Sequence, residues 1–348
     1  MGVLSWVGSK FNLSDQLGNL NWTPAQIPNQ SGKVYIVTGG NSGIGYEVAR
    51  NLLERNARVI IASRDLEKCK KAAQELQQKV NSGKVEAAEL NLASMGSIRS
   101  FADDFASKGL PLNCLVCNAG VFLPPYAKTE WGSEVSIGVN YVGHFVLTHL
   151  LMEQLKAAAP SRVIWVASPA EASGVPDLSD PLGYHRRDSG LISYGTSKEY
   201  MIMAAVEMQR RGQGLGIDHF PVQPGLVGTP LLNMDPDAQK LDPKKPASWL
   251  MWTQDKLFAQ GPEKGCWSTL YAATNPELQG HGPSYYGPLY ILPQPLNFFN
   301  TAKLNPHSKH PGDPAATAKL YDETAKEVEK VLGSRLPNVL RQHEAAAV

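Results

Sequence analysis

The sequence lacks the features that mark several protein classes, and cysteine is the first of them. Only four cysteines occur in 348 residues, too few for a secreted domain built on disulfides. Cys114 and Cys117 form a Cys-x-x-Cys motif inside a short, mostly apolar run. No second Cys-x-x-Cys completes a zinc ligand set, so we interpret both as buried core thiols in a reducing compartment and expect no metal site.

An excess of charge and a long apolar run are also absent. There are 33 basic and 32 acidic residues, for a net charge of +1, so nothing favours a nucleic-acid partner. No apolar run reaches the roughly 18 residues of a membrane-spanning helix. Residues 1–11 lack the charged start and apolar core of a secretory signal. We expect a cytoplasmic or organelle-stromal protein, whose apolar N-terminal residues either pack on the body or make peripheral contact with a membrane.

What the sequence does contain is a regular alternation of short apolar runs with longer amphipathic stretches, beginning at Lys33. Such alternation is typical of a parallel sheet covered by helices on both faces. We predict an α/β fold with a Rossmann-type, doubly wound parallel sheet in a single domain. Strands are expected at 34–37, 58–62, 85–90, 114–117, 162–166 and 217–222, and helices at 43–55, 66–80, 98–106, 139–156, 192–211 and 320–332.

This single domain is expected to carry an extension at each end. Residues 1–32 are interpreted as an N-terminal arm, 33–299 as the domain itself, and 300–348 as a C-terminal loop followed by the last helix. Segment 226–262 interrupts the alternation, and it is rich in Pro, Asp and Lys but also holds several Leu, Met and Trp residues. A long segment of this kind forms either a lid or pocket wall, or a plain surface excursion, and both interpretations stay open.

A glycine-rich turn, Thr38–Gly45, lies at the first expected strand-to-helix junction. Glycines at such a junction let backbone N–H groups approach a pyrophosphate, and the N-terminus of the following helix adds favourable partial positive charge. The spacing is G-x-x-x-G-x-G rather than G-x-G-x-x-G, but the position between strand and helix is the required one. The turn therefore predicts dinucleotide binding.

The end of the second expected strand bears on which dinucleotide is bound. An enzyme that uses NAD carries an acidic side chain there for the ribose 2′-hydroxyl, whereas this chain has Ser63 followed by Arg64. A guanidinium can pair with a 2′-phosphate. We therefore predict NADP(H) as the cofactor, with Arg64 as a solvated surface charge as the alternative.

Further along the chain, Tyr194 and Lys198 are four residues apart, which places them on one face of a helix. A nearby ammonium stabilises a phenolate and so lowers the tyrosine pKa from its usual value of about 10. A tyrosine tuned in this way can act as general acid in reduction and as general base in oxidation. The hydroxyl of Ser168, at the end of an expected strand, can hydrogen-bond a substrate oxygen as negative charge develops on it. Such a Tyr/Lys pair alone is usually an ordinary surface pair, but beside the glycine turn and Ser168 we favour catalysis.

Together these motifs resemble the short-chain dehydrogenase/reductase family over about residues 25–292. The glycine turn resembles the family's cofactor motif, Cys117–Gly120 resembles its Asn-Asn-Ala-Gly motif with cysteine in first place, and Pro224-Gly225 with Thr229 resembles the segment that holds the nicotinamide amide. The resemblance implies that Asn140 holds a water in a proton relay. It implies the catalytic residues Asn140, Ser168, Tyr194 and Lys198. The cofactor-binding residues it implies are Gly39, Asn41, Ser42, Gly43, Ile44, Gly45, Ser63, Arg64, Asn91, Leu92, Asn118, Ala119, Gly120, Tyr194, Lys198, Pro224, Gly225, Val227 and Thr229.

Within the family, the segments 61–65 and 140–145 resemble the branch of retinol dehydrogenases, WW-domain oxidoreductases and protochlorophyllide reductases. The chain departs from the pattern of this branch at two sites. Glu199 and Tyr200 follow Lys198 where light-dependent reductases usually have Val and Cys. Asn91 stands where the branch usually has an Asp near the adenine, and an amide can still make that contact.

We therefore predict an NADP-dependent oxidoreductase that moves a hydride between nicotinamide and a lipophilic carbonyl or alcohol, such as a retinoid, steroid or fatty aldehyde. The apolar side chains of 226–262 suit such a substrate. The alternatives are a light-dependent protochlorophyllide-type reductase and a non-catalytic dinucleotide-binding scaffold. We interpret His144 as structural and the run His185–Arg187 as a solvated loop. The oligomeric state stays open.

Overall fold

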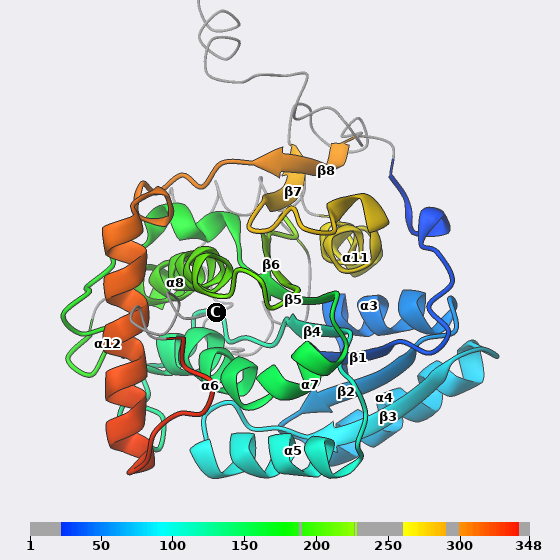
Figure 1. Cartoon of the computed structure of the whole chain (residues 1–348), viewed down its shortest axis with the longest axis horizontal. Helices are drawn as coiled ribbons and strands as arrows, with labels where there is room; N and C mark the ends of the chain where they lie inside the picture. The colour runs from blue at the N-terminus through cyan, green and yellow to red at the C-terminus, as the bar shows by residue number, and fades with distance from the viewer. Residues whose placement is uncertain (1–21, 188–189, 226, 228–259, 290–298, 341–348) are drawn as a thin grey trace, which may run out of the picture.

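A computed structural model describes residues 22–187, 190–225, 227, 260–289 and 299–340. Within these ranges, eight strands form one sheet in the order β3-β2-β1-β4-β5-β6-β7-β8 (Figure 1). All neighbours from β3 to β7 run parallel, and β8 is antiparallel to β7. The predicted doubly wound α/β sheet is confirmed. The strands are β1 (Val34–Thr38), β2 (Arg58–Ser63), β3 (Lys84–Glu89), β4 (Cys114–Cys117), β5 (Ser161–Val166), β6 (Ile217–Val222), β7 (Tyr285–Leu289) and β8 (Phe299–Leu304).

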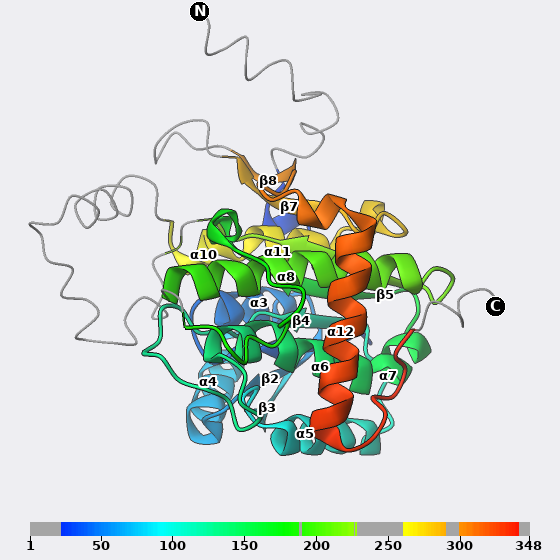
Figure 2. The same cartoon turned by 90° about the vertical axis from the view of Figure 1, so that its left-hand side faces the viewer.

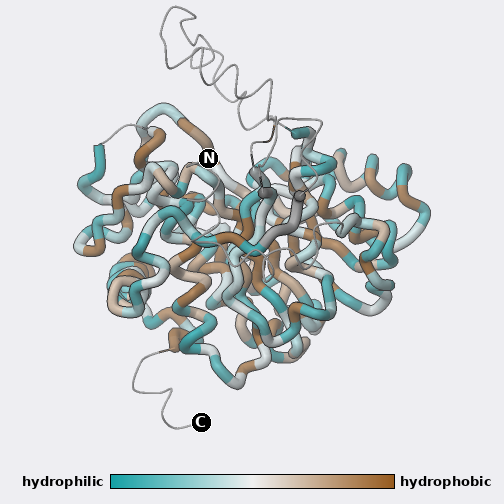
Figure 3. Tube along the Cα trace, turned by 90° about the horizontal axis from the view of Figure 1, so that it is seen from above, coloured by the Kyte–Doolittle hydropathy of each residue, from teal (hydrophilic) through white to brown (hydrophobic). Residues whose placement is uncertain are grey.

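Helices cover the two faces of the sheet as two separate hydrophobic cores. Alternate residues of a strand point to opposite faces, and β1 shows this directly: Ile36 belongs to one core, while Tyr35 and Val37 belong to the other. The hydrophobic stretches run through the middle of the molecule in Figure 3. The face that contains Ile36 is covered by α5 (Met95–Ser107), α6 (Gly143–Leu150), α7 (Met152–Ala157), α8 (Gly190–Arg211) and α12 (Pro314–Leu332). The opposite face is covered by α3 (Gly43–Leu53), α4 (Leu66–Lys79), α10 (Pro262–Gly265) and α11 (Trp267–Thr274).

Capping side chains set where several helices begin. Asp65 accepts a hydrogen bond from the backbone N–H of Lys68 at the start of α4, and Ser94 accepts one from Ser97 at the start of α5. Such caps satisfy N–H groups that have no partner inside the helix. The cap at Ser94 explains why α5 begins at Met95, earlier than the predicted residue 98.

The prediction of one continuous helix over 139–156 is wrong. The chain first forms a π-helical turn, Ile137–Val142, in which the N–H of Gly143 bonds the carbonyl of Gly138. The chain then continues as α6 and, after a break at Leu151, as α7. Gly143 packs closely at the end of this turn, where a Cβ atom would lie 2.6 Å from the carbonyl oxygen of Leu92. The wider turn matters for function because it contains Asn140.

The prediction of a loop over 300–318 is also wrong. Phe299–Leu304 forms the edge strand β8, and α12 begins at Pro314, where the side chain of Asp313 accepts hydrogen bonds from the N–H groups of Ala315 and Ala316. Figure 2 shows α12 lying across α6 and α8. Proline suits the first turn of a helix, so a proline-rich start is compatible with a helix after an aspartate cap.

Buried polar pairs fix α12 to the domain. The hydroxyl groups of Tyr141 and Thr324 lie 2.8 Å apart, and Nε2 of His149 lies 2.8 Å from the hydroxyl of Tyr321. Arg211 of α8 donates two hydrogen bonds to the carboxylate of Asp322, at 2.7 and 2.9 Å. The C-terminal helix is therefore part of the packed body, and its position is coupled to that of α8.

At the other end of the chain, the described part of the N-terminal arm packs on the domain. The ring of Trp22 meets that of Tyr271 edge to face at 5.5 Å, and Gln30 accepts a hydrogen bond from the hydroxyl of Tyr35 at 2.6 Å. Across the described ranges, no helix has the length and apolar character needed to cross a membrane. All four cysteines are buried and free, in agreement with their interpretation as core thiols.

Candidate active site

The glycine-rich turn joins β1 to α3 and is shaped by the absence of side chains. Gly39 and Gly43 have φ angles of +67° and +57°, which side chains rarely tolerate. A Cβ atom on Gly45 would lie 2.5 Å from the carbonyl oxygen of Gly39. Ser42 precedes α3 but makes no side-chain capping bond. The start of α3 is thus a close-approach cradle that fits a pyrophosphate group, through backbone N–H groups and the helix dipole.

Thr38 ties this turn to the segment after β4. Its Oγ1 accepts hydrogen bonds from the N–H groups of Asn118 and Ala119, both at 2.9 Å, and its carbonyl accepts one from Nδ2 of Asn118, also at 2.9 Å. Nε2 of His144 lies 2.9 Å from the same Oγ1, and burial lowers the pKa of His144 to about 4. His144 is therefore a neutral structural group, as interpreted from the sequence. Thr38 begins the glycine motif, yet its role as an anchor depends on contacts about 80 residues away.

The remaining positions predicted to hold the adenine half of the cofactor lie along the same edge of the sheet. The parallel strands β1, β2 and β4 end at Thr38, Ser63 and Cys117, so the residues that follow them are neighbours. Arg64 is exposed directly after β2. Asn91 follows β3, and its Oδ1 accepts a hydrogen bond from the N–H of Ala93 at 3.0 Å. This row of strand ends is where ligands of open parallel sheets bind.

The catalytic corner lies after β5, where Ser168, Tyr194 and Lys198 come together. Ser168 caps the 3-10 helix Pro169–Ser173, and its hydroxyl lies near enough to the Tyr194 side chain to lower the pKa of that phenol. The Tyr194 side chain is buried, and its ring meets the Phe122 ring edge to face at 4.8 Å. Nζ of Lys198 lies 5.7 Å from the centre of the Tyr194 ring. Ser168 lies 26 residues before Tyr194 and 30 before Lys198 in the sequence, and the fold brings the three together, with Tyr194 and Lys198 buried and Ser168 partly buried.

Burial, rather than the ammonium, dominates the electrostatics of this corner. It raises the pKa of Tyr194 to about 12, against a smaller lowering effect of the Ser168 hydrogen bond. It also lowers the pKa of Lys198 to about 7, and Nζ donates a hydrogen bond to the carbonyl of Val166 at 2.8 Å. The expected lowering of the tyrosine pKa is therefore wrong for this state of the site, because the ammonium is itself disfavoured by burial. Tyr194 is a protonated phenol at neutral pH.

Asn140 contacts the same corner from the π-helical turn. It is fully buried. Its Oδ1 accepts a hydrogen bond from the N–H of Val121 at 2.8 Å, and its Nδ2 donates to the carbonyl of Val121 and to Oγ of Ser197, at 3.1 and 2.9 Å. The side chain thus fixes the segment after Gly120 against α8, which makes it a positioning group. The water-holding role implied by the family resemblance stays a prediction.

The predicted nicotinamide-binding segment follows β6. Gly225 has a φ of +77°, and the carbonyl of Pro224 accepts a hydrogen bond from Nε2 of Gln260 at 2.6 Å. Gln260 also pairs with Val227 as an isolated parallel bridge. Sequence reasoning missed Gln260, which has no recognisable motif around it. Thr229 and residues 228–259 of the proposed lid lie outside the described residues.

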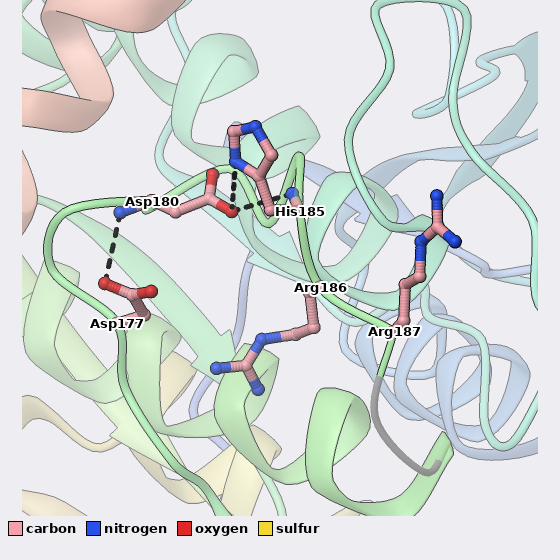
Figure 4. A pocket seen from close by; sticks show the side chains of 5 residues that line it. All are labelled: Asp177, Asp180, His185, Arg186 and Arg187. Atoms are coloured by element: carbon pink, nitrogen blue, oxygen red, sulfur yellow. Dashed lines mark hydrogen bonds and ion pairs between the residues drawn. The ribbon is translucent and has the colours of Figure 1, made fainter.

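The loop between Ser168 and Tyr194 contains a small polar hollow of about 220 Å³ (Figure 4). Asp180 accepts hydrogen bonds from the backbone of Tyr184 and His185. Arg186 donates to Oγ1 of Thr196 at 2.8 Å and to the carbonyl of Val175. The hydrogen bonds of Asp180 and Arg186 therefore hold the loop against itself and against α8. Arg186 is a structural residue rather than the solvated charge expected from sequence.

The chain is similar to one known family, to several named proteins and to solved structures. Residues 33–240 match the family model for short chain dehydrogenases. Retinol dehydrogenase 11 of Mus musculus is 38% identical over 261 residues, which cover 75% of this chain and 78% of that protein. Polyprenol dehydrogenase of Danio rerio is 38% identical over 282 residues, which cover 78% of this chain and 82% of that protein. The solved structure of an uncharacterised protein from Mycobacterium paratuberculosis is 29% identical, with a TM-score of 0.68, and covers 91% of this chain and 99% of that one.

Proposed function

This chain belongs to the short-chain dehydrogenase/reductase family of oxidoreductases, in its retinol dehydrogenase-like branch, and from that premise we propose that it reduces lipophilic carbonyls with NADPH. The observation that carries the proposal is the grouping of the partly buried Ser168 with the buried Tyr194 and Lys198, on the same sheet edge as the glycine cradle. When bound, the dinucleotide supplies the hydride in reduction or accepts it in oxidation.

The chain's own residues supply the proton and the polarisation. Tyr194 carries a proton at neutral pH, because burial keeps its pKa high, so it serves as general acid toward the carbonyl oxygen in reduction. The hydroxyl of Ser168 stabilises the charge that develops on that oxygen. Lys198 is the adjacent ionisable group whose pKa, about 7, allows it to take or give a proton near neutral pH. Tyr194 and Lys198 are buried and Ser168 is partly buried, so the groups that exchange the proton are largely shielded from water.

We favour NADPH over NADH on charge. The cradle at Gly39, Gly43 and Gly45 fits the pyrophosphate of either dinucleotide. Ser63 and the exposed Arg64 present a hydroxyl and a guanidinium at the end of β2, where an NAD enzyme carries an acid. A 2′-phosphate would pair with Arg64, and the acid that follows it, Asp65, is engaged in capping α4 through the N–H of Lys68.

The substrate class rests on the relatives. By their names, two of them act on retinol and on polyprenol, both long apolar alcohols. An apolar pocket would bind such chains in proportion to the surface they bury, by up to about 0.8 kcal/mol for each methylene. We propose retinoid-, steroid- or fatty-aldehyde-like carbonyls, and we expect KM to fall with chain length.

The test is a substrate screen that follows the absorbance of NADPH. Aldehydes of increasing chain length, retinaldehyde and a steroid ketone form one set, and each is assayed in light and in darkness. We expect turnover in both conditions, with lower KM for the longer aldehydes. Turnover that requires light and a pigment would favour the photochemical alternative, and binding of NADPH without turnover on any carbonyl would favour a scaffold. A KM that is flat or rises with chain length would contradict the substrate class.

A further inference from the structure

Two buried glutamates flank the catalytic corner, and the proposed reaction does not use either of them. Glu171 lies three residues after Ser168, in the 3-10 helix, and Glu199 directly follows Lys198 in α8. Both are 0% exposed. A carboxylate removed from water costs several kcal/mol unless polar or charged partners compensate it. The partners of these two groups therefore indicate what they are for.

Their partners come from one segment of the C-terminal part of the chain, residues 307–310, which we name the clasp. The backbone N–H of His307 donates to Oε1 of Glu171 at 2.8 Å, and Nδ1 of the same histidine lies 2.7 Å from that oxygen. The hydroxyl of Ser308 donates to Oε1 of Glu199, and Nδ1 of His310 lies 2.8 Å from the same atom. One short segment thus holds both carboxylates.

The two elements that carry the glutamates also touch each other without intervening side chains. A Cβ atom on Gly195, the residue after Tyr194, would lie 2.5 Å from the carbonyl oxygen of Ala170. A Cβ atom on Gly174 would lie 2.5 Å from Oε2 of Glu199. Because the contact is backbone on backbone, a small movement of either element changes the distance between Ser168 and Tyr194.

A purely stabilising role explains these residues poorly. Replacing buried charged groups by apolar ones of similar volume is often neutral or stabilising, and Oε2 of Glu199 has no hydrogen-bond partner among the residues that the structure describes. What the arrangement does supply is a fixed relative position of the 3-10 helix and α8. Each carboxylate accepts hydrogen bonds that hold its own element to the clasp. The clasp in turn lies between β8 and α12, both of which are packed on the domain.

We propose that Glu171 and Glu199 are positioning residues and that the clasp, through them, sets the distance between Ser168 and Tyr194. The inference deepens the proposed function and rests on it, since it assigns the C-terminal part of the chain to the geometry of the reacting site. It predicts that loosening the clasp lowers kcat and leaves cofactor binding intact, because the glycine cradle lies after β1, away from these contacts.

The test uses the full-length chain with both clasp histidines replaced, His307→Ala with His310→Ala. Both side chains are partly exposed, at 64% and 44%, so their removal opens no cavity in the core, and what it removes is part of the compensation of the two carboxylates. Lys309→Ala is the matched control, since this exposed residue lies between them in the same segment. We expect the double variant to lose about 10-fold to 100-fold in kcat, the scale of a small misplacement of reacting groups. The affinity for NADPH should stay at the wild-type value, and the control should match the wild type throughout.

A second pair of variants separates shape from charge. Glu199→Gln keeps an oxygen that can accept from Ser308 and His310, so it should retain more turnover than Glu199→Ala. Equal turnover of the double histidine variant and wild type would overturn the inference, as would parallel losses of kcat and NADPH affinity, which indicate general unfolding.

A readout independent of turnover keeps the inference distinct from the proposed function. In protein labelled with fluorotyrosine, the Tyr194 resonance is assigned by its absence in Tyr194→Phe. The clasp variant should shift this resonance, and Lys309→Ala should not. If wild type reduces no carbonyl, the proposed function fails, while an unshifted resonance in the clasp variant would refute the positioning role by itself.

Discussion

The glycine turn after β1 and the catalytic corner after β5 lie along the same edge of the sheet, yet different forces hold them in place. At the turn, backbone meets backbone, and a Cβ atom on Gly45 would come within 2.5 Å of a carbonyl oxygen. At the corner, buried polar side chains meet one another, and burial shifts the pKa of both Tyr194 and Lys198.

This difference predicts which property of the enzyme a mutation at the turn or at the corner would change. The turn is a steric device whose glycines lie within eight consecutive residues, Thr38–Gly45, and which Thr38 anchors to Asn118 and Ala119. The corner is an electrostatic device assembled from β5, the 3-10 helix, α8 and the clasp. Changes at the turn should therefore act on cofactor affinity, and changes at the corner on turnover and on pH dependence.

The largest expected effect is on turnover at the corner. Tyr194→Phe keeps the buried ring and its edge-to-face contact with Phe122 but removes the transferable proton. We expect kcat to fall by roughly 10²–10⁴, with NADPH affinity nearly unchanged. Rapid-mixing kinetics and a fluorescence titration of NADPH measure the two quantities. A Phe variant with wild-type turnover would show that another group donates the proton.

The matching change at the turn is Gly45→Ala. Its Cβ atom would collide with backbone, which cannot move aside as a side chain can. We expect a loss of about 3 kcal/mol, the upper end of the range for overpacking, in stability or in NADPH binding. Gly96→Ala is the control, because a Cβ atom there meets nothing nearer than 3.9 Å, and alanine favours a helix by up to about 1 kcal/mol. Calorimetry on both variants measures their stability and their affinity for NADPH. If both quantities are the same in Gly45→Ala and in the wild type, the backbone of the turn can move apart to accept a side chain.

A smaller effect is expected from charge at the rim of the cradle. Arg64→Ala should narrow the preference for NADPH over NADH by roughly 1–3 kcal/mol, the scale of a hydrogen bond to a charged group. The affinity for NADH should stay the same, since it lacks the 2′-phosphate. Titration of both cofactors against both proteins measures this, and equal affinities for NADPH and NADH in the wild type would remove the basis for the preference.

The glycine turn and the catalytic corner also differ in how well they could be predicted from the sequence. The turn was predictable because its residues are adjacent and lie between a strand and a helix. Six of the eight strands were predictable because most of them are short apolar runs, whereas β7 and the edge strand β8 were not predicted. Ser168, Tyr194 and Lys198 were identified by spacing and chemistry beside the glycine turn and by their resemblance to family motifs, and the structure then brings them together.

What sequence missed depends on contacts between distant segments. The π-helical turn at Asn140 ends at Gly143, which packs closely against Leu92, about 50 residues away. The clasp histidines lie in a stretch that reads as a polar loop, and only their pairing with Glu171 and Glu199 gives them a role. The tyrosine pKa was expected to fall because spacing reveals the neighbouring lysine but not the depth at which both are buried.

The pH dependence of stability at Lys198 also tests that last point, and its effect for one pH unit is the smallest of those expected. Burial lowers its folded pKa to about 7 from 10.5, so between these values the unfolded chain binds a proton that the folded chain does not. The free energy of unfolding of the wild type, relative to Lys198→Met, should therefore rise with pH by roughly 1 kcal/mol per unit from about pH 7 to 10. Above about pH 10 the raised pKa of Tyr194 acts in the opposite sense in both proteins. Urea denaturation of both proteins without cofactor at pH 6, 7, 8 and 9 measures the difference. A constant difference across this range would mean that Lys198 keeps its ordinary pKa, and that the corner is no more electrostatic in character than the turn.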